Sequence, residues 1–356
     1  MTTPVTFALL GCGRVSNRYL EVFAEELKGG VIVGCCDLDD EKAETAARRA
    51  GGGARAFTDV DEMLVATCPD IVCVLTESGN HYRHTRHLLE KGCNVLVEKP
   101  VVMIPAQAYE LAELARSKGL MLTVVKQNRW NPAIRKLKET MDSGRFGTLV
   151  SATFRLRWCR LQSYYEDGWH GTWAMDGGVI NQQAIHHVDA LNWICGPVEA
   201  VCTAATKRVN QLEAEDTMAA VLRFSNGALG TIEATTAARP RDFEASLSVV
   251  GDKGMALIGG IALNRIEIWS FVDPLPEDAQ VPAQWSQEVP TGYGLGHGPY
   301  LQDVVTRLSG NDRTPVLSAE DGVKAQELVH AFYASVEQGG WVSLADKPQS
   351  SRLGRG

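Results

Sequence analysis

The first constraint on the fold is a short apolar run that ends in a glycine-rich turn near the start of the chain. Phe7-Ala8-Leu9-Leu10 has the composition of a buried strand, and Gly11-Cys12-Gly13-Arg14-Val15-Ser16 follows it directly. In a strand, turn and helix of this kind, the first glycine makes the turn and the second lets a phosphate group approach the backbone. The helix N-terminus then attracts the negative charge. Ser16 replaces the usual third glycine but is small enough for close packing. The pattern favours a nucleotide-binding unit, although glycine-rich turns are common in α/β proteins.

A second apolar run, Val31-Ile32-Val33-Gly34-Cys35-Cys36, ends at Asp37. A carboxylate at this distance from the glycines accepts hydrogen bonds from the adenosine ribose and repels a 2′-phosphate. An acidic residue after a buried strand is also often a solvated loop residue. Because the glycines precede it, we favour the ribose contact and predict NAD rather than NADP as the cofactor.

Polar side chains follow two further apolar runs. Thr76-Glu77-Ser78-Gly79-Asn80 follows Ile71-Val72-Cys73-Val74-Leu75, and Glu98-Lys99-Pro100 follows Leu96-Val97. Ligands of open parallel sheets bind at the carboxyl ends of the strands. Lys99 would therefore lie where a nicotinamide ring sits. The residues predicted from these patterns to bind the cofactor are Gly11, Gly13, Arg14, Val15, Asp37, Thr76, Ser78, Asn80, Glu98 and Lys99.

Composition excludes several other classes of protein. The chain has 356 residues, which suits two domains, and its 45% hydrophobic and 22% charged residues are ordinary globular values. A net charge of −8 without a basic stripe argues against nucleic-acid binding. The apolar runs are too short to span a membrane, and Met1-Thr2-Thr3-Pro4 does not resemble a signal peptide. We expect a cytoplasmic protein whose nine cysteines are reduced.

The repeating pattern of strands and helices stops near residue 125. An amphipathic helix is predicted over 106–118, and the strand 120–125 follows it. Asn131 and Pro132 have the signature of a helix N-cap and first helical residue. We predict an NAD-binding α/β domain over 1–125 and an α+β domain for substrate binding and oligomerisation over 126–356.

The second domain shows the alternation typical of half-buried strands. Apolar and polar residues alternate over 150–158, and Asn226-Gly227 is a hairpin turn between the strands 218–224 and 228–234. The segments 243–250 and 255–258 flank a further turn. This pattern predicts a large, open, mostly antiparallel sheet. A last helix over 319–336, with a capping box at Ser318 and Asp321, is expected to pack on this domain.

The chain resembles the family of glucose-fructose oxidoreductase, inositol dehydrogenase and rhizopine-catabolism proteins (Gfo/Idh/MocA), whose members pair a Rossmann domain bearing a Glu-Lys-Pro motif with an open-sheet domain. Within the family it is most similar to bacterial UDP-N-acetyl-2-amino-2-deoxyglucuronate 3-dehydrogenases of surface-polysaccharide biosynthesis. The segments that carry the resemblance are Phe7–Arg14, Val124–Arg129, Tyr164-Tyr165, Trp169–Trp173, Asp176–Gly178, Gln183–His186 and Tyr293–His297, and they span nearly the whole chain.

The resemblance implies a mechanism. Lys99 matches the lysine that contacts the nicotinamide ribose and the reacting hydroxyl, and His186 matches the histidine that takes or gives the proton. A neutral imidazole works near physiological pH, and an ammonium stabilises a developing alkoxide. His187 lies about 100° around a helix from His186, so only one of the two can face a substrate. The alternative is that His186 is a core histidine.

The resemblance also implies further contacts. His81 and Gln127 match cofactor-binding positions, and the predicted substrate-binding residues are Arg160, Tyr165, Asn181, Gln182, Gln183, His186, Tyr293 and His297. Relatives have Asp or Asn at the position of Gln182, four residues before the histidine on the same helical face, and Arg at the position of His170. These two departures put the sugar and an anionic contact in question.

Several of these residues have ordinary alternatives. Arg160 could be a surface arginine, and the glycine-rich loop around Tyr293 could be a plain connection. His81, His84 and His87 have a spacing that looks metal-like, but steps of three drift around a helix, so we predict no metal site.

We therefore expect an NAD-dependent enzyme that oxidises carbon 3 of UDP-N-acetyl-glucosaminuronate. An inositol or free-aldose dehydrogenase is the alternative within the family, and a non-catalytic NAD-binding sensor is the alternative outside it. The expected partners are the sugar substrate and further copies of the chain, in a tetramer or dimer, and no nucleic acid or membrane.

Overall fold

The structure is a computed structural model that describes residues 3–355. Contacts between residues divide the chain into two compact units. Unit 1 consists of Met1–Val125 and His297–Val323, and unit 2 consists of Lys126–Gly296 and Lys324–Gly356. The sequence analysis assigned all residues after 125 to the second domain, whereas the contacts group the segment His297–Val323 with the first unit.

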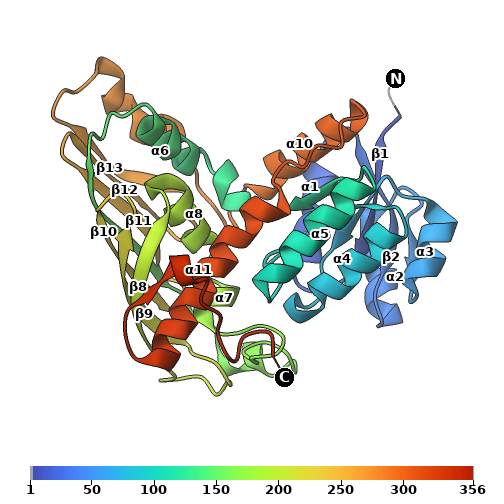
Figure 1. The fold of residues 1–356 in the computed structure, drawn as a ribbon. Coiled ribbons are helices and arrows are strands. Elements are labelled where there is room, and N and C mark those ends of the chain that lie inside the picture. Colours follow the sequence, from blue (N-terminus) through green and yellow to red (C-terminus); the bar gives the residue numbers. More distant parts are fainter. Residues whose placement is uncertain (1–2, 356) are drawn as a thin grey trace. The chain divides into compact units, whose positions relative to one another are not determined.

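Unit 1 alternates strands with helices (Figure 1). Its strands are β1 (Val5–Leu10), β2 (Gly30–Cys36), β3 (Arg55–Phe57), β4 (Ile71–Val74), β5 (Asn94–Val97) and β6 (Leu122–Val124). Its helices are α1 (Ser16–Glu25), α2 (Asp40–Ala50), α3 (Val60–Thr67), η1 (Ser78–Asn80), α4 (His81–Glu90), α5 (Pro105–Ser117), α10 (His297–Ser309) and the start of α11 (Ala319–Gln338).

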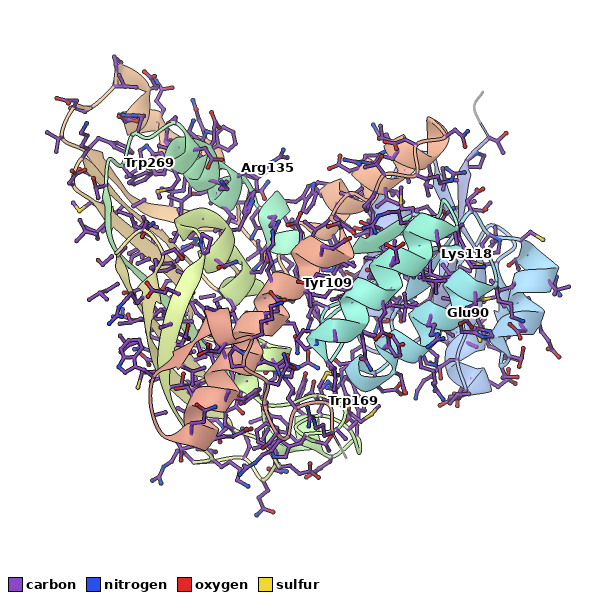
Figure 2. All side chains as sticks on the ribbon, in the orientation of Figure 1. Glu90, Tyr109, Lys118, Arg135, Trp169 and Trp269 are labelled. Carbon is purple, nitrogen blue, oxygen red and sulfur yellow. The ribbon has the colours of Figure 1, made fainter. Side chains whose placement is uncertain are left out.

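The strands of unit 1 form one parallel sheet in the order β3-β2-β1-β4-β5-β6. Strands β2 and β3 lie on one side of β1, and strands β4 to β6 lie on its other side. Ligands of such sheets bind at the switch point between β1 and β4. Strands β4 and β5 are buried along their whole length, as expected for strands covered by helices on both faces. Figure 2 labels Lys118 and Glu90 at the ends of the neighbouring helices α5 and α4, where Lys118 Nζ donates to the Glu90 carbonyl at 3.1 Å.

The returning segment His297–Val323 completes the edge of this sheet. The Val124 amide in β6 donates to the Leu317 carbonyl at 3.0 Å, and the Tyr300 hydroxyl of α10 donates to the Val124 carbonyl at 2.9 Å. Leu317, Ala319 and Val323 belong to the same hydrophobic core as the strands. The first 125 residues therefore do not make the whole unit.

Unit 2 is built around a second sheet. Its strands are β7 (Leu149–Arg157), β8 (Val198–Thr206), β9 (Thr217–Phe224), β10 (Leu229–Thr235), β11 (Glu244–Gly251), β12 (Gly254–Gly259), β13 (Arg265–Phe271) and β14 (Val342–Ser343). Its helices are η2 (Gln127–Trp130), α6 (Pro132–Asp142), η3 (Gln162–Tyr165), α7 (Val179–Gln182), α8 (Ile185–Cys195), η4 (Pro276–Gln280), α9 (Val281–Trp285), η5 (Leu344–Asp346) and the rest of α11.

The second sheet has eight strands in the order β13-β12-β11-β7-β10-β9-β8-β14. All its pairs are antiparallel except β7 and β10, which confirms the expected mostly antiparallel sheet. Helices α6, α7 and α8 pack on one face, where Phe154 and Leu156 of β7 are buried. The residues that alternate with them point to the other face, which we call the open face.

Apolar side chains lie on the open face of the second sheet. They are Val221, Leu229, Val250, Met255 and Ile268, which are 40–54% exposed. A network of ion pairs lies on the same face, in which Arg157 joins Glu233 at 2.7 Å and Glu244 at 3.1 Å. This mixture of apolar and paired charged groups is typical of a surface that can bind another protein.

Most of the predicted elements are present with small shifts in their bounds. The helix predicted over 106–118 is α5, the last helix is α11, and the Asp321 amide donates to Ser318 Oγ at 3.1 Å as a cap requires. Asn131 precedes α6 as predicted, but its side chain does not cap the helix: Nδ2 donates to the Ala262 carbonyl at 2.8 Å. The strand predicted over 120–125 is shorter, Leu122–Val124. Within residues 3–355, no helix has the length and apolar character needed to cross a membrane.

Candidate active site

The glycine-rich turn of unit 1 is held by the carboxylate that ends β2. Asp37 Oδ2 accepts a hydrogen bond from the Cys12 amide at 2.7 Å, and Oδ1 accepts from the Asp39 amide at 3.0 Å. Gly11 has a φ of +96°, and a Cβ there would lie 2.8 Å from the Leu75 carbonyl, so only glycine fits. The turn, β2 and the end of β4 are thereby packed against one another.

These residues fit a dinucleotide. A Cβ at Gly13 would meet no atom within 4 Å, so the backbone there is open to an approaching phosphate. The Gly13 carbonyl accepts from Ser16 Oγ at 2.7 Å, which explains how serine replaces the third glycine. Gly11, Gly13, Arg14 and Val15 would hold the pyrophosphate, and Asp37 would hold the ribose of the adenosine.

A buried carboxylate lies beside Lys99. Glu98 is 4% exposed; its Oε1 accepts from the Tyr19 hydroxyl at 2.9 Å, and its Oε2 accepts from the Lys99 amide at 3.1 Å. His297 Nε2 lies 3.4 Å from Glu98 Oε1. Burial opposes ionisation, but the hydrogen bond and charge of His297, together with Lys99, hold the pKa of Glu98 below its ordinary value. Glu98 is therefore an ionised group that fixes the backbone of the predicted catalytic lysine.

His297 has surroundings that the sequence analysis did not anticipate. We predicted a substrate contact from a flexible glycine-rich loop, but His297 is the first residue of α10, 1% exposed, and its ring lies edge-on to Tyr19. It packs inside unit 1 because the returning segment brings it to Glu98. Tyr293, which lies in the loop itself, is 43% exposed.

The polar residues after β4 are placed as predicted, at the carboxyl end of the strand. Thr76 precedes η1, which contains Ser78 and Asn80, and His81 begins α4. The His81 ring is buried between the carbonyls of Pro100, at 2.6 Å, and Thr76, at 3.0 Å. Burial lowers the pKa of His81. Its ring thus ties the Thr76 loop to the loop of Lys99, although we predicted a contact with the cofactor.

The three histidines of α4 face different partners. His84 Nδ1 lies 2.9 Å from Thr76 Oγ1, and His87 Nε2 lies 2.8 Å from Asp61 Oδ1. Within residues 3–355, no group of three or more His, Cys, Asp or Glu side chains is arranged to hold a metal ion.

In unit 2 the predicted base lies on α8. His186 is 8% exposed, and its Nε2 lies 3.4 Å from the Gln127 side-chain nitrogen. The Gln127 side chain, predicted to bind the cofactor, is therefore directed at His186. The next residue, His187, stacks on Phe154 with 5.0 Å between the ring centroids and is buried, which lowers its pKa to about 3. The expectation that the two histidines point in different directions is confirmed.

The helix that was expected to carry Gln182 and His186 on one face is two helices. α7 ends at Gln182 and α8 begins at Ile185, so the four-residue helical spacing does not apply. Asn181, Gln182 and Gln183 are nevertheless all buried, with 0–7% exposure. Within residues 3–355, the Gln183 side-chain amide has no hydrogen-bond partner, which is costly for a buried amide. This amide is suited to receive a polar ligand.

A second buried carboxylate supports α7. Glu215 is 4% exposed; its Oε1 accepts from the Ile180 amide at 3.2 Å and from the Tyr333 hydroxyl at 3.1 Å. Burial raises the pKa of Glu215 to about 7. The Gly178 amide donates to the Tyr333 oxygen at 2.9 Å, so Tyr333 and Glu215 together hold the start of α7.

The remaining predicted substrate residues have partners of their own within unit 2. Arg160 Nη1 donates to Asp242 Oδ1 at 3.1 Å and to the Cys159 carbonyl at 2.8 Å, and its guanidinium lies over Trp158. The Tyr165 hydroxyl lies 2.8 Å from Thr236 Oγ1. Arg160 is thus partly neutralised by Asp242, which a free anion-binding arginine would not be.

His170, the other departure from the relatives, is buried. Its Nδ1 lies 2.6 Å from Asp167 Oδ2, and its ring is 3.6 Å from that of Trp169, which Figure 2 labels.

The sequence analysis missed the ion pair between Arg129 and Asp189. Arg129 Nε and Nη2 donate to the two Asp189 oxygens at 2.7 and 2.8 Å. Asp189 is three residues after His186, a helical spacing that could have drawn attention to it. Nothing in the sequence pairs it with Arg129, which is 60 residues away.

Comparison with known proteins identifies the family. Residues 5–126 match the model of the oxidoreductase family with an NAD-binding Rossmann fold, and residues 134–257 match that of the GFO/IDH/MocA C-terminal domain. The chain is 33% identical to the WlbA dehydrogenase of Bordetella pertussis, solved with NADH and UDP-GlcNAcA, with a TM-score of 0.90 over 97% of this chain and 99% of the other. The WlbA dehydrogenase of Chromobacterium violaceum, solved with the same two ligands, is also 33% identical, with a TM-score of 0.88 over 96% of each chain.

A curated relative is named for a D-glucoside. The D-glucoside 3-dehydrogenase of Escherichia coli is 26% identical over 96% of this chain and 98% of its own length. Together with the Rossmann sheet, the glycine turn and the Glu98-Lys99-Pro100 motif, these similarities settle the class of the protein. The chain belongs to the Gfo/Idh/MocA oxidoreductases and is an NAD-dependent enzyme of a family of sugar dehydrogenases.

Proposed function

We propose that the enzyme oxidises carbon 3 of UDP-N-acetyl-glucosaminuronate with NAD. The observation that carries the proposal is the 33% identity over nearly the whole chain to two dehydrogenases that were solved with NADH and UDP-GlcNAcA. The name of the Escherichia coli relative, D-glucoside 3-dehydrogenase, supports carbon 3 as the position of attack.

Lys99 and His186 are assigned the chemical roles. NAD, when bound, accepts a hydride from the substrate carbon. His186 takes the hydroxyl proton, since a neutral imidazole is a base of suitable strength. The Lys99 ammonium donates a hydrogen bond to the same oxygen and stabilises the negative charge that develops as the proton leaves. Glu98 fixes the Lys99 backbone through the amide hydrogen bond of 3.1 Å.

The sugar is assigned to the buried polar groups around α7. Asn181, Gln182 and Gln183 supply amides that can pair with hydroxyls and the acetamido group, and the orphaned amide of Gln183 favours such a ligand. Tyr165 and Tyr293 are assigned to the nucleotide part of the substrate. Arg160 is assigned to an anionic part, which would take the place of Asp242 as the partner of its guanidinium. Tyr293 is 43% exposed and lies in a loop between α9 and α10, which suits it to contact an incoming ligand.

An alternative substrate is a free sugar or inositol, because Gln182 departs from the Asp or Asn of the relatives that this chain resembles. Relatives of this chain include a D-apiose dehydrogenase, 26% identical over 95% of this chain, and inositol 2-dehydrogenases. A free sugar or inositol would use the same Lys99 and His186 but would not need a nucleotide contact. A non-catalytic NAD-binding sensor is less well supported, because it would have no need of either residue.

A panel of substrates tests the proposal. The purified enzyme with NAD is given UDP-GlcNAcA, UDP-GlcNAc, D-glucose, a D-glucoside and myo-inositol, and NADH formation is followed by absorbance. We expect kcat/KM for UDP-GlcNAcA to exceed that for every free sugar by about a hundredfold or more, since the nucleotide and carboxylate supply binding energy. Preference for a free sugar or inositol would replace the proposed substrate. NAD binding without turnover of any compound would favour the sensor.

We also propose that the enzyme is a homo-oligomer that pairs through the open face of the second sheet. Support comes from the partly exposed Val221, Leu229, Val250, Met255 and Ile268 on that face. Apolar groups gathered on one face of a sheet are stabilised by a partner that excludes water.

A further inference from the structure

Two contacts join the same pair of elements in unit 2, the 3₁₀ helix η2 and helix α8. In the first, Gln127 Nε2 lies 3.4 Å from His186 Nε2. In the second, two residues further along η2, Arg129 donates to both oxygens of Asp189 at 2.7 and 2.8 Å. Because Asp189 is three residues after His186, both contacts lie on one side of α8.

The ion pair between Arg129 and Asp189 has a geometry that fixes η2 relative to α8. The Arg129 and Asp189 side chains are 12% and 3% exposed, so solvent weakens their interaction little. Two parallel hydrogen bonds from a planar guanidinium fix both the distance and the angle between the two elements. The Arg129 guanidinium also lies 5.1 Å from the ring centroid of Trp193, one turn further along α8. A lysine could match the charge but not this geometry.

The contact between Gln127 and His186 depends on that position. At 3.4 Å it is long for a hydrogen bond, so a small displacement of η2 would remove it. Because a side-chain amide nitrogen only donates, we infer that Nε2 of His186 accepts and that the proton of the neutral ring is on Nδ1. Gly296 packs against the backbone of Gln127: a Cβ there would lie 2.0 Å from the Gln127 carbonyl oxygen.

We propose that Arg129 and Asp189 are positioning residues for the base. Their ion pair holds η2 against α8 so that the Gln127 amide meets His186 and keeps the ring in the tautomer whose Nε2 is unprotonated. When the substrate is bound, its hydroxyl replaces the Gln127 amide as the donor to the Nε2 lone pair, which then takes the hydroxyl proton. The inference rests on the proposed function, in which His186 removes the proton of the substrate hydroxyl.

A matched pair of variants tests the proposal. Arg129→Lys keeps the positive charge but loses the pair of parallel hydrogen bonds that the guanidinium makes to Asp189. Arg145→Lys does the same to a second bidentate pair of unit 2, in which Arg145 donates to Asp278 at 2.8 and 2.7 Å without contacting η2 or α8. With UDP-GlcNAcA and NAD, we expect Arg129→Lys to lower kcat by about tenfold or more, because a base displaced by even 1 Å is much less effective. The KM for NAD should stay unchanged. Arg145→Lys should keep the wild-type kcat even if it lowers the melting temperature as much as Arg129→Lys does.

The His186→Asn background separates positioning from general damage. If Arg129 acts through His186, Arg129→Lys should cause no further loss of kcat in the His186→Asn enzyme. Equal losses in both backgrounds, or equal kcat values for the two arginine variants, would overturn the proposal.

A spectroscopic test does not depend on the substrate. In protein with carbon-13-labelled histidine, the His186 signal is identified by its loss in His186→Asn, and its shift should report the Nδ1-protonated tautomer. In Arg129→Lys and Gln127→Leu, the His186 ring should become a mixture of the Nδ1-protonated and Nε2-protonated tautomers. In Arg145→Lys, the tautomer should be the same as in the wild type. A His186 signal that is the same in all four proteins would contradict the inference. An inactive wild-type enzyme on every sugar, with the expected tautomer changes, would contradict the proposed function and leave the positioning role in place.

Discussion

The two units of this enzyme build their sites in different ways. In unit 1 the predicted cofactor residues lie in the turns that end parallel strands. The site there is formed largely by the backbone: Gly11 bends the chain, and Asp37 holds the Cys12 amide. In unit 2 the predicted base is on a helix, and its surroundings are buried polar side chains from distant segments, such as Arg129 and Asp189. A site made of backbone turns has a recognisable sequence pattern, whereas a site made of paired side chains does not.

The largest expected effect is the loss of turnover when the predicted catalytic residue of either unit is replaced. His186→Asn and Lys99→Ala should each lower kcat by about two orders of magnitude or more, the usual size of a general acid–base or oxyanion contribution. NAD affinity, measured by calorimetry, should be unchanged in His186→Asn and weaker in Lys99→Ala. Lys118→Ala, at the end of α5, is the control and should behave as wild type. Near-normal turnover of His186→Asn would assign the base to another residue, with a neutral Lys99 as the next candidate.

The second prediction concerns the backbone-built site alone. Asp37 should make NAD bind about a hundredfold more tightly than NADP, because a carboxylate against a 2′-phosphate is strongly unfavourable. In Asp37→Ser this preference should largely disappear. NAD affinity should fall as well, since the carboxylate also holds the Cys12 and Asp39 amides. Isothermal titration with both cofactors measures this, and equal affinities in the wild type would refute the assignment of Asp37.

The third prediction tests whether the buried polar groups of unit 2 make stability depend on pH. Burial raises the pKa of Glu215 to about 7, so the folded state keeps this proton after the unfolded state has released it. The free energy of unfolding should therefore fall as the pH rises from about 4.5 to 7, by about 3 kcal/mol at most.

The variant Glu215→Gln, which keeps an acceptor for Tyr333, should remove this decline. Chemical denaturation between pH 5 and 8 compares the two proteins. Glu233→Gln serves as control, because Arg157 lowers the pKa of Glu233 and confines its effect to more acidic solution. Parallel curves for wild type and Glu215→Gln would show that Glu215 stays ionised throughout.

The smallest effect on catalysis is expected from the open face of unit 2. Leu229→Lys, which lies opposite Arg223 in the β9–β10 register, should shift the wild-type oligomer to smaller species, since two like charges would be buried together at the interface. Light scattering measures the mass, and kcat per subunit should change less than twofold. Glu199→Lys, an exposed charge change in β8, is the control. A wild-type protein that is a monomer at micromolar concentration would refute the proposed pairing.

Much of the fold could be predicted from the sequence, for reasons that differ between its parts. The alternation of apolar runs with amphipathic segments predicted the parallel sheet, and Asn226-Gly227 predicted the β9–β10 hairpin. The return of His297 to Glu98 could not be predicted, because no local pattern specifies a contact between residues so far apart in the chain. The break between α7 and α8 was missed because no glycine or proline marks it: the chain turns there through hydrogen bonds from the Gln183 and Ala184 amides to the Val179 carbonyl, at 3.2 and 2.9 Å.

The same distinction holds within the candidate site. Motif and family resemblance predicted Lys99 and His186, yet gave no account of what orients them. In the structure Glu98 Oε2 lies 3.1 Å from the Lys99 amide, and the Gln127 side chain lies 3.4 Å from His186 Nε2. We propose that Arg129, through its 2.7 Å contact with Asp189, positions the second of these contacts.

The return of His297–Val323 to unit 1 also has a consequence for how the chain folds as it is made. The ribosome releases residues 1–125 first, but Leu317, Ala319 and Val323 of the same core follow only after all of Lys126–Gly296. Until then β6 lacks the Leu317 carbonyl that accepts from Val124, and Glu98 lacks His297. Domains usually fold in the order of their synthesis. Here the nucleotide-binding unit begins first and is completed only when most of the second unit has been translated.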